Sequence, residues 1–345
     1  MQETISRVRE KSEALYLSEA YNNLKEIHLT GNNDYVAEVD KIIKDFYAYS
    51  HAFITKTPKL YKIEEIDEAC LKKVRLAIEV ENVIFQCAFF LKQSSNLVVC
   101  FNGARKEIET LFSRASWYSF ANASFLVVDD PTIFEYKEKE LGLAWYWGTQ
   151  KVDYLQLISK IVKKIEDVVN IKQTVYFGSS GGGHAALSIA RYTSNTIHIA
   201  QNPQIYIDKY FSYSKFVNIT QLSAIDDPLG RNNIPAVISR SKNKFFIVQN
   251  LHDKHHINKH LFPLLKELSF GTDLNIGLTK YRNLLIWLYD SPLGHKAFGD
   301  KLFFSNILYF SKLLDNEVIS EFDRYLSINI AMMLREQDKL SAQII

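Results

Sequence analysis

Short apolar runs alternate with helical patterns from about residue 73 onward, and this alternation constrains the fold more than any other feature of the chain. A strand that is apolar on both faces belongs to a parallel sheet covered by helices, and the shortness and the β-branched and aromatic content of these runs favour strands. We therefore predict an α/β fold with a mostly parallel central sheet flanked by helices and an antiparallel hairpin at its start. The predicted strands span residues 76–80, 83–91, 96–101, 124–128, 174–177, 196–200, 245–248 and 284–288, and the predicted helices span 154–169, 183–192 and 258–268.

The segments outside this alternation have helical patterns of their own. Residues 1–55 repeat apolar positions at three- and four-residue steps on either side of a break at 31–34, which predicts an N-terminal helical hairpin and a candidate contact for a homo-oligomer. Residues 301–345 are predicted to form helices that pack on the main domain, which spans 73–300. Within that domain the less regular segment 208–243 is interpreted either as a cap or as a plain connection.

Charge and composition argue against several classes of protein. The formal net charge of +2 over 345 residues is too small to favour nucleic acid or an anionic membrane as a partner. No window approaches the roughly 18 apolar residues of a transmembrane helix, and the N-terminus lacks the apolar stretch of a secretory signal. The cysteines Cys70, Cys87 and Cys100 fit neither a zinc site nor a disulfide framework, and the last two are predicted to be buried thiols. We therefore expect a cytoplasmic protein.

The segment 175–187 contains Gly178-x-Ser180-x-Gly182 between a predicted strand and a predicted helix. Glycine two residues before and after Ser180 removes side chains that would collide in a sharp turn, and this pattern is typical of the nucleophile elbow of α/β-hydrolases. Ser180 is the predicted nucleophile, and the N–H of Gly181, at the helix N-terminus, is predicted to donate to an oxyanion. The alternative, a phosphate-binding loop, lacks its Gly-Lys-Ser/Thr ending and the phase of G-x-G-x-x-G.

A nucleophilic serine needs a histidine to take its proton, and in this fold the chain order is serine, acid, histidine. His295 lies in a loop after the strand 284–288 and is the predicted base, with a surface loop histidine as the alternative. Asp253 follows the strand 245–248 and is the predicted acid that orients the imidazole, with a helix N-cap as the alternative. The competing acids are Asp226, Asp227 and Asp290.

The loop after the strand 96–101 is expected to supply the second oxyanion donor, from the N–H of Gly103 or Ala104. Asn102 and Arg105 are predicted to contact substrate, Arg105 through an anionic group. An ordinary Asn-Gly turn is the alternative interpretation of this segment.

A cluster of histidines lies near the predicted acid, at positions 252, 255, 256 and 260. Residues 256 and 260 would share one helix face, but the glutamate of H-E-x-x-H and a third ligand are missing, so no metal is predicted. His256 is instead predicted to contact a polar substrate, with a solvent-facing position as the alternative.

Four segments together resemble bacterial α/β-hydrolase-like proteins of capsule and cell-surface polysaccharide gene clusters, the group that contains meningococcal capsule O-acetyltransferase. The resemblance spans residues 75–300 and implies an O-acetyltransferase that takes acetyl-CoA as donor and a glycan hydroxyl as acceptor, without a tightly bound cofactor. Trp145 in the aromatic segment 145–148 would stack on a sugar ring or lie in the core. The segments are 97–104, 130–132 with 145–148, 178–182, and 249–256 with 294–295.

Two other functions remain open at this level. A carbohydrate or carboxyl esterase would use the same three residues and let water complete the reaction. A non-catalytic hydrolase-like scaffold in polysaccharide or glycoprotein export would need none of them. The choice of a transferase follows from the resemblance, because no CoA motif is visible in the sequence.

Overall fold

The computed structural model describes residues 58–106, 110, 112–119, 123–272, 275–290 and 294–295. The chain divides into a unit of residues 1–57 and a unit of residues 58–345, and the described residues belong to the second. The predicted N-terminal hairpin and the predicted C-terminal helices lie outside the described residues.

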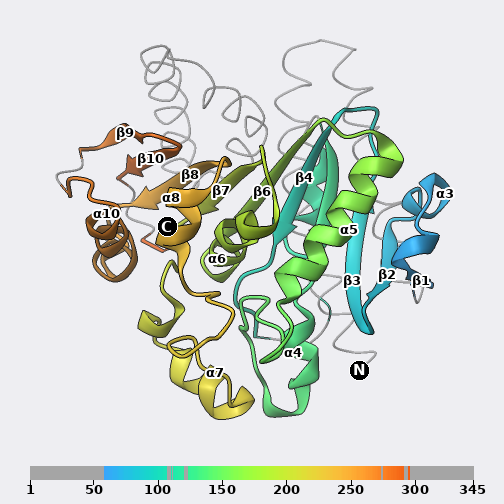
Figure 1. The fold of residues 1–345 in the computed structure, drawn as a ribbon, viewed down its shortest axis with the longest axis horizontal. Coiled ribbons are helices and arrows are strands. Elements are labelled where there is room, and N and C mark those ends of the chain that lie inside the picture. The colour runs from blue at the N-terminus through green and yellow to red at the C-terminus, as the bar shows by residue number, and fades with distance from the viewer. Residues whose placement is uncertain are drawn as a thin grey trace, which may run out of the picture. The chain divides into compact units, whose positions relative to one another are not determined.

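The described residues form a ten-stranded sheet with the order β1-β2-β3-β5-β4-β6-β7-β8-β10-β9 (Figure 1). Three neighbouring pairs are antiparallel, β2 with β3, β3 with β5, and β9 with β10, and the other pairs are parallel. The predicted mostly parallel sheet with an antiparallel start is therefore confirmed. The strands are β1 (Leu60–Lys62), β2 (Arg75–Val80), β3 (Val83–Phe90), β4 (Asn96–Phe101), β5 (Ser124–Val128), β6 (Gln173–Ser179), β7 (Ile197–Gln201), β8 (Lys244–Asn250), β9 (Gly277–Tyr281) and β10 (Leu284–Tyr289).

Helices connect the parallel strands, and α4 and α7 lie beyond the carboxyl ends of the strands (Figure 1). The α-helices are α3 (Glu68–Leu71), α4 (Pro131–Glu135), α5 (Tyr154–Val169), α6 (Gly181–Ser188), α7 (Tyr213–Thr220), α8 (Ile234–Arg240), α9 (Lys254–His256) and α10 (Phe262–Glu267). A π-helical stretch, Ile257–Leu261, joins α9 to α10. The 3-10 turns are η1 (Ile63–Glu65), η2 (Ala115–Ser119), η3 (Lys137–Lys139), η4 (Ile189–Tyr192) and η5 (Ile207–Lys209).

The structure adds elements that the sequence pattern did not indicate. The sheet begins before residue 73, because β1 pairs with β2 from Leu60 onward. β1 has three residues, and β9 has no buried position, so neither shows the apolar run by which the other strands were found. The irregular segment 208–243 contains the two short helices α7 and α8.

Helix α5 shows how local sequence and packing agree. Its N-terminus is capped by the Asp153 side chain, which accepts from the N–H of Leu155 at 2.9 Å, and it ends at Asn170 in a left-handed conformation. Its apolar face buries Ile158, Ile161 and neighbouring residues in the same hydrophobic cluster as strands β2 to β4. Tyr176 of β6, a strand in the middle of the sheet, belongs to the same cluster.

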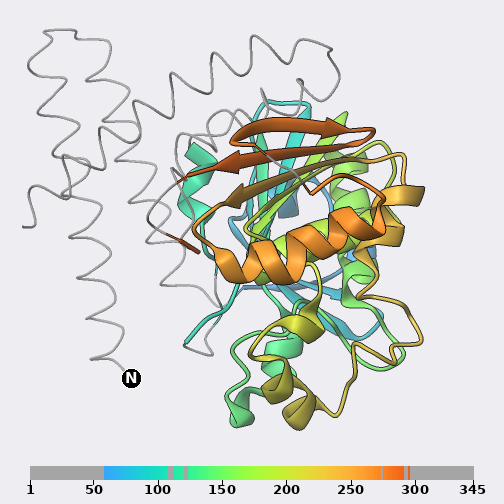
Figure 2. The same ribbon diagram turned by 90° about the vertical axis from the view of Figure 1, so that its left-hand side faces the viewer.

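A second cluster continues on the same side of the sheet. Tyr176, His198 and Phe245, on three adjacent strands, stack with ring centroids 5.0 and 5.3 Å apart, which shows that their side chains share one face. Helices α8 and α10 bury leucine and isoleucine side chains against β8 and β10 on this side. Figure 2 shows the orange helical segment that contains α10 beside the strands of the sheet. The helical segment that follows Asp253 is thereby fixed relative to the strands.

Two predictions from composition concern the described residues. Cys87 and Cys100 are buried, as predicted, and burial raises the pKa of both thiols. Among the described residues, no helix has both the length and the apolar character that crossing a bilayer requires.

Candidate active site

The turn between β6 and α6 is sharp and strained at Ser180. Its backbone has φ 55° and ψ −121°, a conformation that residues with side chains adopt only when their surroundings impose it. A Cβ at Gly178 would lie 2.0 Å from the carbonyl oxygen of Gly182, and a Cβ at Gly182 would lie 2.5 Å from that of Phe101. Both glycines are therefore required for the turn, and the turn presents Ser180 at the start of α6.

Parallel strands bring their carboxyl ends to one edge of the sheet, where their loops meet. Ser180 follows β6, Asp253 follows β8 and His295 follows β10. At this edge, Nε2 of His295 lies 3.0 Å from Oγ of Ser180, and Nδ1 of His295 lies 2.6 Å from Oδ2 of Asp253. Three residues spread over 115 positions thus form one hydrogen-bonded chain.

Each hydrogen bond between these three residues has a defined donor and acceptor. Burial would raise the pKa of Asp253, but hydrogen bonds from His256 and His295 outweigh it and hold the pKa below its usual range. The ionised carboxylate can only accept, so Nδ1 of His295 carries a hydrogen that it donates to Asp253. In the neutral imidazole, Nε2 is then the acceptor that faces the hydroxyl of Ser180. This arrangement suits removal of the hydroxyl proton.

The backbone of the histidine loop is held by two asparagine side chains. Nδ2 of Asn250 donates to the carbonyl of Gly294 at 2.7 Å, and Nδ2 of Asn202 donates to that of His295 at 3.2 Å. Oδ1 of Asn202 in turn accepts from the N–H of Asn250 at 2.8 Å. Residues at the ends of β7 and β8 thereby position the loop that follows β10.

Asp253 combines the two roles that the sequence left as alternatives. Its Oδ1 accepts from the N–H of His256 at 3.3 Å, which caps α9, while its Oδ2 bonds to His295. The competing acids point elsewhere: Asp227 pairs with Arg231 at 2.6 Å, and Asp290 contacts His252 at 2.6 Å. Asp226 is exposed.

His256 supports the triad from the far side of Asp253. Its Nδ1 lies 2.9 Å from Oδ1 of Asp253, and its ring stacks on that of His295 with centroids 4.2 Å apart. Burial lowers the pKa of His256, so the ring stays neutral beside His295. The ligand atoms of Asp253, His256 and His295 lie within 4.8 Å of one another, but they already bond to each other, so an ion is not needed to explain the cluster.

The predicted oxyanion donors differ in their placement. The backbone of Gly103 packs against the elbow, since a Cβ there would lie 3.4 Å from the carbonyl oxygen of Ser179 and 4.0 Å from Cβ of Ser180. Gly181 is the first residue of α6, where a backbone N–H has no partner within the helix. Ala104 is exposed, one residue farther along the loop.

The structure places Asn102 and Arg105 in a buried hydrogen-bond network around Asp129, where the sequence predicted contacts with substrate. Nδ2 of Asn102 donates to Oδ1 of Asp129 at 3.1 Å, and its Oδ1 accepts from Ser113. The guanidinium of Arg105 forms a two-pronged ion pair with Asp129, with only 3% and 1% of the side chains exposed. The buried carboxylate of Asp129 takes the charge that was expected for an anionic substrate.

Trp145 lies in the core, which was the alternative to a sugar contact, and His256 contacts Asp253 instead of substrate or solvent. Trp145 is 1% exposed and its Nε1 donates to Oε1 of Gln204 at 2.5 Å, so its ring is not open to a sugar. His256 is 3% exposed and serves Asp253. Both side chains lie behind the reacting groups, where the sequence pattern alone had no means to place them.

Two residues that sequence reasoning missed lie beside the serine. Nε2 of Gln204 donates to Oγ of Ser180 at 2.8 Å. Burial and the negative charge of Asp253 raise the pKa of Tyr210, and the nearby polar groups of Ser180 and Gln204 partly offset that rise. Tyr210 brings the 208–243 segment to the site. Gln204 could have been found, since it closely follows the strand predicted at 196–200.

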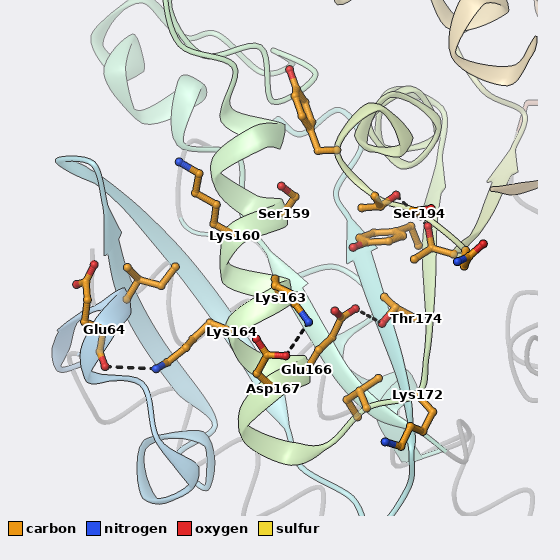
Figure 3. A pocket seen from close by; sticks show the side chains of 17 residues that line it. Glu64, Ser159, Lys160, Lys163, Lys164, Glu166, Asp167, Lys172, Thr174 and Ser194 are labelled. Carbon is orange, nitrogen blue, oxygen red and sulfur yellow. Dashed lines mark hydrogen bonds and ion pairs between the residues drawn. The ribbon is translucent and has the colours of Figure 1, made fainter. Parts of the chain in front are cut away.

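A pocket of about 750 Å³ lies elsewhere, along α5 and the amino-terminal end of β6 (Figure 3). Several of its charged groups have partners within the pocket: Lys163 pairs with Asp167 at 2.6 Å, and Glu166 accepts from Thr174 at 2.6 Å. This pocket is at the opposite edge of the sheet from Ser180 and contains none of the residues of the hydrogen-bonded chain.

Comparisons place the chain by its fold. The sequence matches no protein-family model and no curated protein. A chain of the Glycosylation Associate Protein (Gap123) complex from Streptococcus agalactiae is similar at 15% identity and a TM-score of 0.50, over 71% of this chain and 46% of that one. The fold is α/β-hydrolase-like. A strained strand-to-helix elbow in the middle of a mostly parallel sheet is the feature that decides it.

Two further solved structures have lower TM-scores. The capsule O-acetyltransferase of Neisseria meningitidis serogroup A is 19% identical, with a TM-score of 0.49, over 70% of this chain and 98% of that one. An acetyl xylan esterase from Paenibacillus sp. R4 is 14% identical, with a TM-score of 0.42, over 68% and 79%. None of these likenesses assigns the chain to a family.

Proposed function

We propose that the chain is a serine-dependent acyltransferase, and that it O-acetylates a capsular or cell-surface polysaccharide through an acyl-Ser180 intermediate. The observation that carries the proposal is the hydrogen-bonded chain from Ser180 through His295 to Asp253, with distances of 3.0 and 2.6 Å. The glycan acceptor and acetyl-CoA as donor are supported by the sequence resemblance alone.

In the first half-reaction, Oγ of Ser180 attacks the acyl carbon while Nε2 of His295 takes the hydroxyl proton. The N–H groups of Gly181 and of Gly103 or Ala104 are the proposed donors to the oxyanion. Collapse of the tetrahedral intermediate leaves the acyl group on Ser180 and returns the proton from His295 to the departing thiol. Asp253 stabilises the imidazolium in between.

In the second half-reaction, a sugar hydroxyl gives its proton to His295 and attacks the acyl carbon. The bond between that carbon and Oγ then breaks, and Ser180 recovers its proton from His295. An esterase would follow the same steps with water as the acceptor. The two activities differ in the acceptor that attacks the acyl-enzyme, a sugar hydroxyl or water. An experiment that follows the acyl group therefore distinguishes them.

Incubation of the protein with acetyl-CoA is expected to add about 42 Da, one acetyl group, to the peptide that carries Ser180. Mass spectrometry of the intact and digested protein measures this, with Ser180→Ala as the control that should stay unmodified. Turnover of p-nitrophenyl acetate without an adduct from acetyl-CoA would favour the esterase. Failure of folded protein to react with a fluorophosphonate at Ser180 would contradict acyl transfer and favour the scaffold.

His256→Phe is expected to lower kcat by about 10-fold with little change in KM. The phenyl ring can still stack on His295, but Asp253 loses one of the bonds that fix its carboxylate, and a residue that is 3% exposed cannot contact substrate. Steady-state kinetics measure the split, with the exposed His252→Gln as the control. A raised KM with kcat unchanged would restore the substrate contact and reject the positioning role.

A further inference from the structure

Gln204 lies fully buried beside the nucleophile and is bonded at every polar atom. Its backbone N–H donates to the carbonyl of Ser180 at 3.1 Å, and its own carbonyl contacts Nδ1 of His184 at 2.9 Å. Its side chain bridges Trp145 and Oγ of Ser180, at 2.5 and 2.8 Å. The residue is 0% exposed, two bonds fix its backbone and two fix its side-chain amide, so the amide has one position relative to the serine oxygen.

The chemistry of the partners determines which end of the amide faces the serine. The indole nitrogen of Trp145 can only donate, so the atom it contacts must be the oxygen of Gln204. The NH₂ group therefore faces Ser180 and donates to Oγ. Since Oγ accepts from Gln204, the hydrogen of the hydroxyl can point to Nε2 of His295, which lies 3.0 Å away.

We propose that Gln204 is a catalytic residue. This inference rests on the acyl transfer proposed above. Its side-chain amide, oriented by Trp145, directs the hydroxyl hydrogen of Ser180 toward His295 and stabilises Oγ when this oxygen leaves the acyl-enzyme. Trp145, which does not touch the reacting atoms, is a positioning residue. The amide donates hydrogen bonds throughout and transfers no proton.

Stabilisation of Oγ by the Gln204 amide matters more in deacylation than in acylation. During attack on the acyl donor, a donor bonded to Oγ orients the hydroxyl but also lowers the nucleophilicity of the oxygen, so the two effects oppose each other. During breakdown of the acyl-enzyme, the bond between the acyl carbon and Oγ breaks, and negative charge grows on Oγ until His295 returns the proton. A fixed N–H at 2.8 Å stabilises that charge. Loss of the amide should therefore slow deacylation more than acylation.

Gln204→Met removes the donor and keeps the length of the side chain. We expect the rate constant of deacylation to fall by about 10- to 100-fold and that of acylation to fall less, so that acetyl-Ser180 accumulates. The burst of p-nitrophenol from p-nitrophenyl acetate measures acylation. The loss of the acetyl mass from Ser180 after removal of the reagent measures deacylation.

Gln204→Glu keeps the shape of the side chain but replaces the N–H donor that faces Ser180 with an acceptor. One carboxylate oxygen can still accept from Trp145, but the other now accepts the hydrogen of the Ser180 hydroxyl and takes it away from His295. Acylation should therefore fall further in this variant than in Gln204→Met. Gln156→Met, an exposed glutamine on α5, is the matched control and should leave both steps unchanged.

The outcomes distinguish this inference from the function on which it rests. If Ser180 of the parent protein never becomes acetylated, the proposed acyl transfer itself is rejected. A parent that is labelled, with Gln204→Met deacylating at the parental rate or slowing both steps equally, overturns the role of Gln204. If Gln204→Met does not fold, Trp145→Phe leaves the amide in place without its anchor and must slow deacylation; parental kinetics in that variant also overturn the proposal.

Discussion

Ser180→Ala and His295→Ala should each lower kcat on the order of 10³-fold, and the double variant should lose little more than either alone. The reason is the 3.0 Å contact between Oγ and Nε2, because a hydroxyl without its base and a base without its hydroxyl are equally unable to form the acyl-enzyme. Turnover of p-nitrophenyl acetate by the three variants measures the effect.

The controls for this cycle are Ser239→Ala, an exposed serine on α8, and the unfolding midpoint of each variant. Losses that add strictly in the double variant would mean that Ser180 and His295 do not act as one unit. Such a result would reject the proposed mechanism even if each single variant were inactive.

Gly178→Ala should destabilise the protein by about 3 kcal/mol or more and abolish labelling of Ser180 by a fluorophosphonate. The added Cβ would lie 2.0 Å from the carbonyl oxygen of Gly182 and 2.8 Å from the nitrogen of Gly183. Both are backbone atoms in the first turn of α6, so they can move only if the elbow opens. Guanidinium unfolding and labelling measure the two effects.

Gly271→Ala is the matched control, because no atom lies within 4 Å of a Cβ at that position. It should change the free energy of unfolding by less than about 0.5 kcal/mol. If Gly178→Ala kept the stability and the fluorophosphonate labelling of the parent protein, the elbow would not require glycine at this position. The steric argument for Gly178 would then be wrong.

The sequence predicted the three residues of the hydrogen-bonded series but not the contact of Gln204 with the serine. Ser180, Asp253 and His295 were identified because each follows a strand, and parallel strands send their carboxyl ends to one edge. The bond between Trp145 and Gln204 joins residues 59 positions apart, and the bond between Gln204 and Ser180 joins residues 24 apart. No periodicity or motif spacing links such pairs, so the bond between Gln204 and Ser180 was not predicted, although Gln204 closely follows a predicted strand. The sequence left Trp145 open between a sugar contact and the core, and the fold decides for the core.

The substrate contacts predicted for Arg105 and His256 took no account of the partners that the fold gives these side chains. Arg105 and His256 were assigned from the side chain alone, as groups able to meet a polar ligand, but each has a buried carboxylate as its partner in the fold. A charged or polar group that is removed from water needs such a partner. For Arg105 the partner comes from a different strand end, and for His256 it is the N-cap of the same helix. Sequence shows the group but not which acceptor the fold brings to it.

The amino-acid sequence by itself determined the order of buried strands and helices and the glycine-flanked serine, because short-range periodicity and local steric limits are written in neighbouring residues. Only the tertiary structure decided which polar groups meet at the strand ends. Pairing of Asp253 with His295, of Asp129 with Arg105 and of Gln204 with Trp145 depends on distances between loops, which the packing of helices on the sheet sets.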